Sequence, residues 1–120
     1  MKLLILEDHE LLRKMIYDML KRHFPSDHII SYSNGEDAIE EIKKSPVDIA
    51  VIDIHLPGKN GMQITQQLRI TWPDAIIIIY TNYDIPEYRD NSIKSGADYF
   101  LSKESHMPYD LVQLIKSTIA

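Results

Sequence analysis

Short apolar stretches alternate with longer amphipathic stretches along the whole chain. The short stretches are rich in β-branched and aromatic residues and show little polar alternation, which is typical of strands covered on both faces of a sheet. They span residues 2–6, 28–33, 48–52, 75–80 and 98–102. The pattern therefore predicts five buried strands with a helix after each of them.

The longer stretches repeat apolar residues at helical spacing. In the first helix we expect one buried stripe made of Leu11, Leu12, Met15, Ile16, Met19 and Leu20. The second helix is expected within residues 34–46, the third from Gly61 to about Trp72, and the fourth from Pro86 to Gly96. The fifth begins near Pro108 and is expected to bury Leu111, Val112, Leu114, Ile115 and Ile119.

Five strand–helix units with short connections predict an α/β fold, because right-handed crossovers between them produce a parallel sheet with helices on both faces. The expected architecture is a flavodoxin-like (βα)5 three-layer sandwich with a five-stranded sheet of order 2-1-3-4-5. The 120 residues suit a single domain spanning 1–120. We find no internal linker and no repeat at a solenoid period.

Composition and charge exclude several classes of function. Thirteen Lys and Arg against eighteen Asp and Glu give a net charge of −5, and the basic residues are scattered, so this chain is not expected to bind nucleic acid. The absence of cysteine excludes disulfides, thiolate metal sites and cysteine nucleophiles. No apolar run approaches the roughly 20 residues of a membrane span. We expect a soluble, cytoplasmic domain.

Polar residues follow the predicted strands at their carboxyl ends. Glu7 and Asp8 follow the first strand, Asp53 the third, Thr81 ends the fourth and Lys103 follows the fifth. In doubly wound sheets this edge holds the ligand, beside the point where the winding reverses. We therefore expect these side chains to converge on one pocket.

The expected cluster of three carboxylates requires positive charge, since two charges about 4 Å apart repel by roughly 4 kcal/mol at an effective dielectric constant of about 20. Lys103 supplies one charge, and an octahedral Mg²⁺ that keeps several waters suits a few carboxylates at an exposed rim. Such a site can accept a phosphoryl group on Asp53 while the metal and the lysine neutralise the phosphoryl oxygens.

Each of these residues has a simpler interpretation when taken alone. Acidic residues such as Glu7 and Asp8 favour a helix N-terminus, Thr81 suits a strand end, and Lys103 suits an exposed surface. The histidines lack a metal-ligand spacing and are expected on the surface or in loops: His9, His23, His28, His55 and His106. The combination of residues, rather than any one of them, favours a functional site.

Four segments resemble, in order, the motifs of the response-regulator receiver domain of bacterial two-component signalling. They are LILEDHELLR, VIDIHLPGKNG, IIIIYT and SGADYFLSK, and the resemblance extends across essentially the whole chain. The spacing also fits this family: 45 residues from Asp8 to Asp53, 28 from there to Thr81, and 22 from there to Lys103.

The resemblance implies a role for each acidic residue and for the lysine. Asp53 corresponds to the phospho-acceptor and Lys103 to the lysine that pairs with the phosphoryl group. Asp8 corresponds to a direct ligand of Mg²⁺, as does the acceptor Asp53 itself. Glu7 corresponds to an acid that acts through water, and the backbone carbonyl of His55 to the remaining protein contact.

The resemblance also implies a signalling mechanism. Thr81 corresponds to a switch hydroxyl that turns toward the phosphoryl group, and Phe100 to an aromatic ring that follows it. The face made by the fourth helix, fifth strand and fifth helix would carry the signal to a target.

The implied partner is a sensor histidine kinase or a histidine phosphotransfer protein, and a homodimer is compatible with the resemblance. The domain would not be an enzyme beyond assisting its own phosphoryl transfer and slow self-dephosphorylation.

Three positions depart from the family pattern. Many members have a cis proline after the lysine, whereas this chain has Glu104. Receivers of many regulators with helix-turn-helix output domains share this feature. We expect the peptide bond between Lys103 and Glu104 to be trans. Asn82 and Tyr83 follow Thr81, where a small residue is usual. We hypothesise that Tyr83 and His55 obstruct the path of water to the phosphoryl group and slow its loss.

Other functional classes fit less well. A cofactor-binding flavodoxin-like module needs a phosphate-binding loop rich in Gly, Ser or Thr after the first strand, and EDHELL would repel phosphate. An aspartate-dependent phosphatase needs a second acid two residues after the nucleophile, where this chain has His55. The remaining alternative is a receiver-like module that binds partners without phosphorylation. The output, either a stand-alone receiver or part of a transcriptional regulator, stays open at this point.

Overall fold

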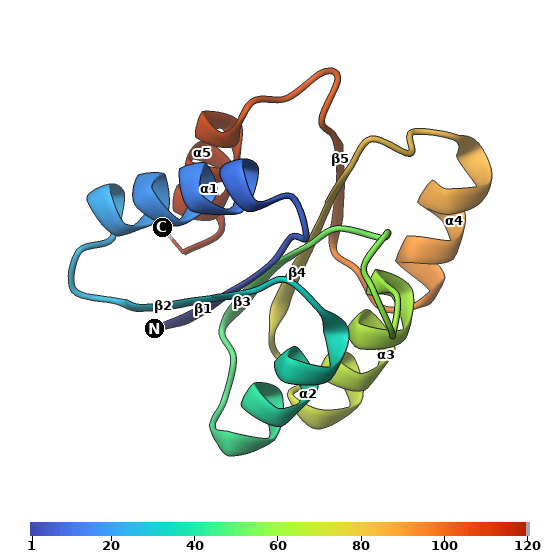
Figure 1. The fold of residues 1–120 in the computed structure, drawn as a ribbon, viewed down its shortest axis with the longest axis horizontal. Helices are drawn as coiled ribbons and strands as arrows, with labels where there is room; N and C mark the ends of the chain where they lie inside the picture. Colours follow the sequence, from blue (N-terminus) through green and yellow to red (C-terminus); the bar gives the residue numbers. More distant parts are fainter. Residues whose placement is uncertain (120) are drawn as a thin grey trace.

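The five predicted strands are present in the computed structural model, which describes residues 1–119. They are β1 (Lys2–Leu6), β2 (His28–Tyr32), β3 (Ile49–Ile52), β4 (Ile76–Thr81) and β5 (Tyr99–Ser102). All neighbouring pairs are parallel and the order is β2-β1-β3-β4-β5, so the predicted flavodoxin-like winding is confirmed (Figure 1). The observed strands differ from the predicted ranges by one residue at several ends, and Thr81 is the last residue of β4.

The helices alternate with the strands as predicted. They are α1 (Glu10–His23), α2 (Gly35–Lys44), α3 (Gly61–Thr71), α4 (Pro86–Lys94) and α5 (Pro108–Ile119). None of these five helices in residues 1–119 combines the length and the apolar character that crossing a bilayer requires.

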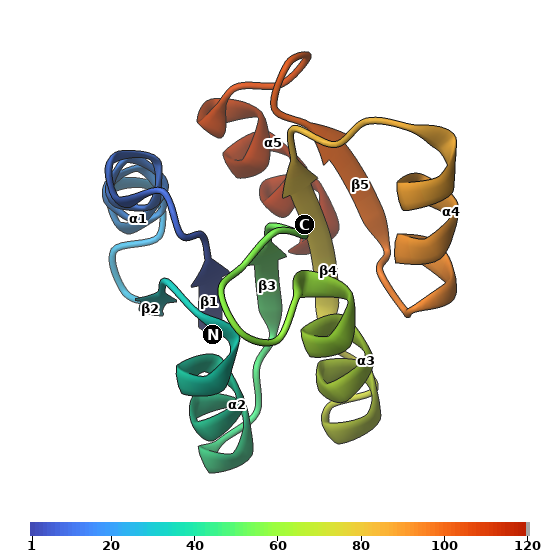
Figure 2. The same cartoon turned by 45° about the vertical axis from the view of Figure 1, so that its right-hand side comes forward.

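Two helical layers cover the sheet, α1 and α5 on one face and α2, α3 and α4 on the other (Figures 1 and 2). Every residue of the central strands β1 and β3 is buried. This explains their continuous apolar sequences, since both pleat faces contact a helix layer. All five carboxyl ends point to the same edge, where the predicted site residues stand.

Local capping interactions fix where the helices begin. Asn60 and Gln63 form a capping box at the start of α3, and the Asn34 side chain accepts from the backbone of α2. At the start of α1 the His9 ring accepts the Leu12 backbone N–H at 3.2 Å. α1 and α2 begin three or four positions after the strands that precede them end, whereas the longer loop 53–60 connects β3 to α3.

The predicted apolar stripe of α1 is wrong in two positions. Leu11 and Met15 are 64% and 45% exposed, whereas Ile16 and Leu20 are fully buried. The two rows lie about 100° apart around the helix, because each residue turns the helix by that angle. The sheet and α5 cover the row that contains Leu12, Ile16 and Leu20, and of the other row only Met19 packs against the core.

At the end of α5, Ile119 is 45% exposed, so the prediction that it is buried is wrong. Ile115 is the last fully buried residue of this helix, and Ile119 lies one turn beyond it, past the edge of the core. The four residues Leu111, Val112, Leu114 and Ile115 do pack in the core layer as predicted. The peptide between Lys103 and Glu104 is trans as expected, since residues 1–119 contain no cis bond.

Candidate functional site

Three carboxylates meet at the carboxyl ends of β1 and β3. One oxygen from each of Glu7, Asp8 and Asp53 lies within 4.8 Å of the others. Glu7 and Asp53 are buried, whereas Asp8 is exposed. The strands are hydrogen-bonded neighbours, and the Asp53 backbone N–H donates to the Leu6 carbonyl at 3.0 Å. This pairing brings together acids that are far apart in the sequence.

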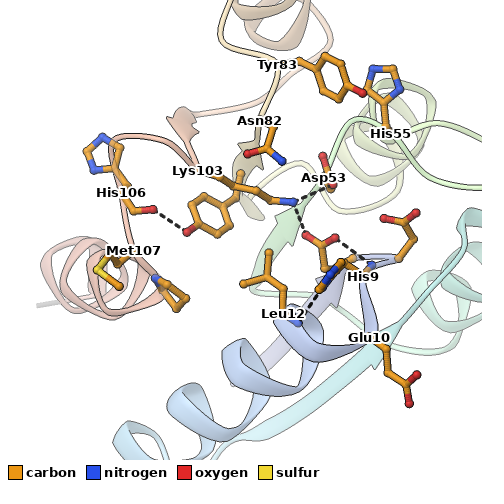
Figure 3. A pocket seen from close by; sticks show the side chains of 14 residues that line it. His9, Glu10, Leu12, Asp53, His55, Asn82, Tyr83, Lys103, His106 and Met107 are labelled. Carbon is orange, nitrogen blue, oxygen red and sulfur yellow. Dashed lines mark hydrogen bonds and ion pairs between the residues drawn. The ribbon is translucent and has the colours of Figure 1, made fainter.

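Lys103 joins this cluster from the end of β5. Its backbone N–H donates to the Thr81 carbonyl at 2.8 Å, which continues the pairing of β5 with β4. Its Nζ lies 2.7 Å from Glu7 Oε1 and 3.0 Å from Asp53 Oδ2 (Figure 3). The ammonium therefore bridges two buried acids. The predicted convergence of acids and lysine is observed, while their chemical roles stay predictions.

Burial and the ion pairs shift the pKa values of two groups in this cluster. Burial raises the pKa of Glu7 above its ordinary value, and the hydrogen bond from Lys103 only partly offsets this. Burial alone would lower the pKa of Lys103, but its hydrogen bonds and charge interactions with Glu7 and Asp53 outweigh the burial, so that this pKa is raised. The lysine therefore stays positively charged at neutral pH.

Asp53 has one oxygen without a partner. Oδ2 accepts from Lys103, whereas Oδ1 is the only buried side-chain polar atom in residues 1–119 that lacks a hydrogen bond. Leaving such an atom unpaired costs about 1–3 kcal/mol, and more when it is charged. An oxygen of this kind among three carboxylates fits a hard cation such as Mg²⁺, which prefers oxygen ligands.

Glycine at position 61 allows α3 to begin directly against Asp53. A Cβ atom on Gly61 would lie 2.1 Å from the Asp53 carbonyl oxygen, and the Gly61 backbone N–H donates to the Ile54 carbonyl at 2.8 Å. In the same loop Gly58 has φ +74°, a left-handed conformation that favours glycine. The missing side chain of Gly61 and the left-handed conformation of Gly58 thus allow the loop to bring the end of β3 against α3.

The two predicted switch residues occupy different environments. Thr81 is fully buried, and its Oγ1 accepts the Tyr83 backbone N–H at 3.3 Å instead of contacting Asp53. Phe100 is half-buried against the core layer of α2, α3 and α4, with the Arg89 guanidinium carbon 5.3 Å from its ring centroid. The adjacent Tyr99 is exposed. Of the two neighbouring rings, Phe100 is therefore the one that faces inward.

Aromatic rings cover the site from the β3–α3 and β4–α4 loops. The ring centroids of His55 and Tyr83 are 3.7 Å apart with planes inclined by 31°, and Tyr88 of α4 approaches both rings edge-on. Figure 3 shows this pair beside Asp53. The sequence indicated that His55 and Tyr83 flank the site but did not reveal that they stack, nor that Tyr88 joins them.

A cavity of about 810 Å³ leads from the acids toward the β5–α5 loop at His106 and Met107. Tyr80, the residue before Thr81, contributes to its wall. The sequence analysis did not predict a place for this tyrosine in the site. Its position beside Thr81 could have indicated a place in the site, because β4 pairs with β5 and Lys103 directly follows β5.

The fold and the site together define a class: flavodoxin-like domains with an acidic, lysine-containing site at the carboxyl edge of the sheet. Residues 3–116 match the family model described as "Response regulator receiver domain". The chain belongs to the response regulator receiver domain family.

Relatives agree with this assignment. The chain is 31% identical over 101 residues to the transcriptional regulatory protein DesR of Bacillus subtilis. The aligned region covers 84% of this chain and 50% of DesR. It is also 31% identical over 103 residues to a cyclic di-GMP phosphodiesterase of Thermotoga maritima, covering 86% of this chain and 27% of that protein. The chain thus spans half or less of these relatives, and their activities as whole proteins do not transfer to it.

A solved structure shows the same fold. A DNA-binding response regulator of the LuxR family from Staphylococcus aureus superimposes with a TM-score of 0.86 at 26% identity, over 97% of this chain and 96% of that one. The observed sheet order and the positions of all five helices are therefore those of a receiver domain.

Proposed function

We propose that Asp53 accepts a phosphoryl group from the phosphohistidine of a sensor histidine kinase or a histidine phosphotransfer protein, and that Mg²⁺ assists the transfer. Membership of the receiver family supports this proposal, since such domains act as phosphorylation-controlled switches. The observation that carries it is the state of Asp53: a buried carboxylate with one oxygen on Lys103 and one without any partner.

In the proposed transfer, an Asp53 oxygen attacks phosphorus as the phosphorus–nitrogen bond of the donor imidazole breaks and its electron pair returns to nitrogen. The product is an acyl phosphate on the aspartate. Lys103 lies 3.0 Å from Asp53 Oδ2, so its ammonium can follow the developing negative charge without crossing the pocket. A preformed charge of this kind stabilises the transition state because it needs no reorganisation.

The residues proposed to hold Mg²⁺ are Asp8, Asp53 and the backbone carbonyl of His55, with Glu7 acting through water. When bound, Mg²⁺ supplies positive charge to the phosphoryl oxygens. Both oxygens of Glu7 are already engaged, Oε1 with Lys103 and Oε2 with the His9 backbone N–H at 3.1 Å. This arrangement supports the indirect role proposed for Glu7, because a direct bond to the metal would have to displace one of these partners.

The proposed switch begins at Thr81 and ends at the face made by α4, β5 and α5. Turning Thr81 toward a phosphoryl group breaks a single long hydrogen bond, the 3.3 Å bond from Tyr83. The Phe100 ring would then move in the half-buried space between β5 and α4. Ser92 is the only buried residue of α4, so this helix has little packing to resist displacement.

The proposed context is a transcriptional response regulator or a stand-alone receiver. Its relatives include transcriptional regulators that are longer than this chain, which favours the first of these contexts. The chain itself is not proposed to bind nucleic acid, and the proposal allows for a homodimer. Since histidine kinases draw their phosphoryl group from ATP, the proposed location is the cytoplasm.

The proposal is tested by incubating the protein with acetyl phosphate and Mg²⁺ and measuring its intact mass. The expected result is a gain of one phosphoryl group in the wild type and none in Asp53→Asn. Asp74→Asn, an exposed acid at the opposite edge of the sheet, serves as the matched control and should be phosphorylated normally. A wild-type protein that gains no mass, or a gain that persists in Asp53→Asn, would contradict the proposal and favour a module that acts by binding alone.

A further inference from the structure

Tyr80 occupies an unusual place for a polar side chain. It is 2% exposed and packs with the apolar residues that fill the core layer between the sheet and helices α1 and α5. Its hydroxyl donates to the His106 carbonyl in the β5–α5 loop at 2.7 Å (Figure 3). The Lys103 Nζ lies 5.9 Å from the centroid of its ring. One side chain thus contacts both the lysine of the site and the loop that follows it.

We propose that Tyr80 is a positioning residue for Lys103: its ring supports the ammonium and its hydroxyl holds the β5–α5 loop in place. This inference rests on the proposed function, in which Lys103 must follow charge as it moves from Asp53 to a phosphoryl group. Tyr80 would not touch the phosphoryl group itself and acts through the lysine.

The ring explains how the ammonium can remain fixed while its acidic partners change. In the present state Glu7 and Asp53 both hold Lys103, but phosphorylation converts the Asp53 carboxylate into an acyl phosphate, a mixed anhydride. The face of an aromatic ring attracts a cation within about 6 Å, and more strongly when the cation is shielded from water. Lys103 is 11% exposed, so the Tyr80 ring supplies a contact that does not depend on the state of Asp53.

The hydroxyl explains why tyrosine rather than leucine occupies this core position. Burying a hydroxyl is unfavourable unless it is hydrogen-bonded, so packing alone would favour an apolar residue. The bond to His106 satisfies the hydroxyl and ties β4 to residues 103–107, a short loop otherwise held mainly by bonds to Ser102. Because Lys103 begins this loop, fixing the loop also fixes the backbone from which the lysine extends.

The protonation of Tyr80 is compatible with this role. Burial raises the pKa of its phenol above the ordinary value of 10.0. The hydroxyl therefore remains a donor across the neutral range, and the His106 carbonyl, which can only accept, is a suitable partner.

Two variants separate the ring from the hydroxyl. Tyr80→Phe keeps the ring and removes the bond to His106, whereas Tyr80→Leu removes both. Ile78→Val, on the same face of β4 and fully buried, is the matched control, since it weakens the same core layer without contacting Lys103 in the structure. Each protein is phosphorylated with acetyl phosphate and Mg²⁺, and the rate is followed by intact mass at a temperature where all are folded.

We expect Tyr80→Leu to slow phosphorylation about three- to tenfold, Tyr80→Phe to slow it about twofold, and Ile78→Val to leave the rate unchanged. The second measurement is the nuclear magnetic resonance shift of the Lys103 ε-methylene protons, which the ring current of Tyr80 displaces. This shift should persist in Tyr80→Phe and be lost in Tyr80→Leu. The shift reports whether the ring lies over the lysine, and the comparison of the rates of Tyr80→Leu and Ile78→Val separates the positioning of Lys103 from a loss of core packing.

The outcomes distinguish the inference from the function on which it rests. A wild type that is not phosphorylated overturns the proposed function and this inference with it. A wild type that is phosphorylated, with Tyr80→Leu as fast as Ile78→Val, overturns the positioning role alone. If Tyr80→Leu does not fold, an unchanged rate in Tyr80→Phe together with an unshifted Lys103 signal in the wild type likewise overturns the positioning role.

Discussion

Lys103 and Glu7 form a buried ion pair, with Nζ 2.7 Å from Oε1 and the Glu7 side chain only 2% exposed. Asp53 is the second partner of the same ammonium at 3.0 Å. Removing one member of a buried pair leaves a charge without compensation, typically at a cost of about 3–5 kcal/mol. The lysine therefore supplies the positive charge that allows two acids to remain buried together, and a metal ion at the site would share with it the task of neutralising the same cluster of acids, through the other Asp53 oxygen.

Replacing Lys103 with Met should strengthen the binding of Mg²⁺ about tenfold, because the metal becomes the only source of positive charge for the two acids. Isothermal titration calorimetry with MgCl₂ measures the effect. Lys43→Met removes an exposed lysine of α2 and should leave the affinity unchanged. Weaker binding in Lys103→Met would mean that the ammonium helps to form the metal site instead of competing with the metal.

Glu7 should make the fold less stable as the pH rises from acid toward neutral. Its pKa is raised in the folded state, chiefly by burial, so the folded protein keeps this proton to a higher pH than the unfolded chain does. Its contribution to stability is complete below the ordinary value of 4.5 and is lost as the pH rises through the folded pKa.

Urea unfolding of the wild type and Glu7→Gln between pH 4 and 8, without Mg²⁺, tests this expectation. The free energy of unfolding of the wild type, relative to Glu7→Gln, should fall as the pH increases. A difference that is constant, or that grows with pH, would show that the ion pair with Lys103 outweighs burial at this carboxyl. Glu10→Gln, at an exposed site on α1, should show no such trend.

A second charge cluster, at the opposite edge of the sheet, should show the reverse dependence. Lys2 is 6% exposed, and its Nζ donates to Glu41 Oε2 at 2.8 Å and to Ser45 Oγ at 2.7 Å. The Tyr32 hydroxyl donates to Glu41 Oε1 at 2.8 Å. The hydrogen bond from Lys2, followed by that from Tyr32, lowers the pKa of Glu41.

Because this pKa is lowered, the Glu41 carboxylate contributes stability that is present above the ordinary value of 4.5 and is lost as the pH falls through the lower folded value. Glu41→Gln should therefore be less stable than the wild type near neutral pH, with a difference that shrinks on acidification. Chemical unfolding from pH 7 down to pH 3 measures it, with the exposed neighbour Glu40→Gln as control. A deficit that is independent of pH would indicate lost packing instead of a lost charge.

The sequence predicted correctly those parts of the site whose position depends only on the order and direction of the strands. Parallel strands end at one edge, so Asp8, Asp53 and Lys103 had to converge once the strand order was known. The periodicity of α1 was less informative, because Leu11 and Leu12 are equally apolar and only the position of α5 decides which one faces the core. Helical spacing alone carries no information about the extent of the covering layer.

Contacts made by side chains across loops were not predictable in the same way. The stacking of His55 on Tyr83 depends on two loop conformations and two side-chain torsions, and the residues lie 28 positions apart in the sequence. The Tyr80 hydroxyl likewise finds its partner, the His106 carbonyl, in a loop whose path is not encoded by any apolar period. Such contacts depend on loop conformations that the sequence pattern does not specify, although the residues themselves lie beside recognisable motifs.

The stacked pair of His55 and Tyr83 should prolong the life of the phosphorylated state. Both rings line the cavity that also contains Asp53, and we expect them to obstruct the approach of water to the phosphorus atom. The double variant His55→Ala with Tyr83→Ala should lose its phosphoryl group about tenfold faster, which corresponds to a barrier lowered by about 1.4 kcal/mol. Intact mass measured over time, after removal of acetyl phosphate, gives the lifetime.

His55→Phe is the control that separates coverage from chemistry. It retains an aromatic ring that can stack on Tyr83 but removes the imidazole nitrogens, so a lifetime close to that of the wild type is expected if steric exclusion of water is the cause. A short lifetime in His55→Phe would instead assign the effect to a hydrogen bond from the imidazole. An unchanged lifetime in the double alanine variant would show that neither ring limits access, because water would then reach phosphorus equally well without them.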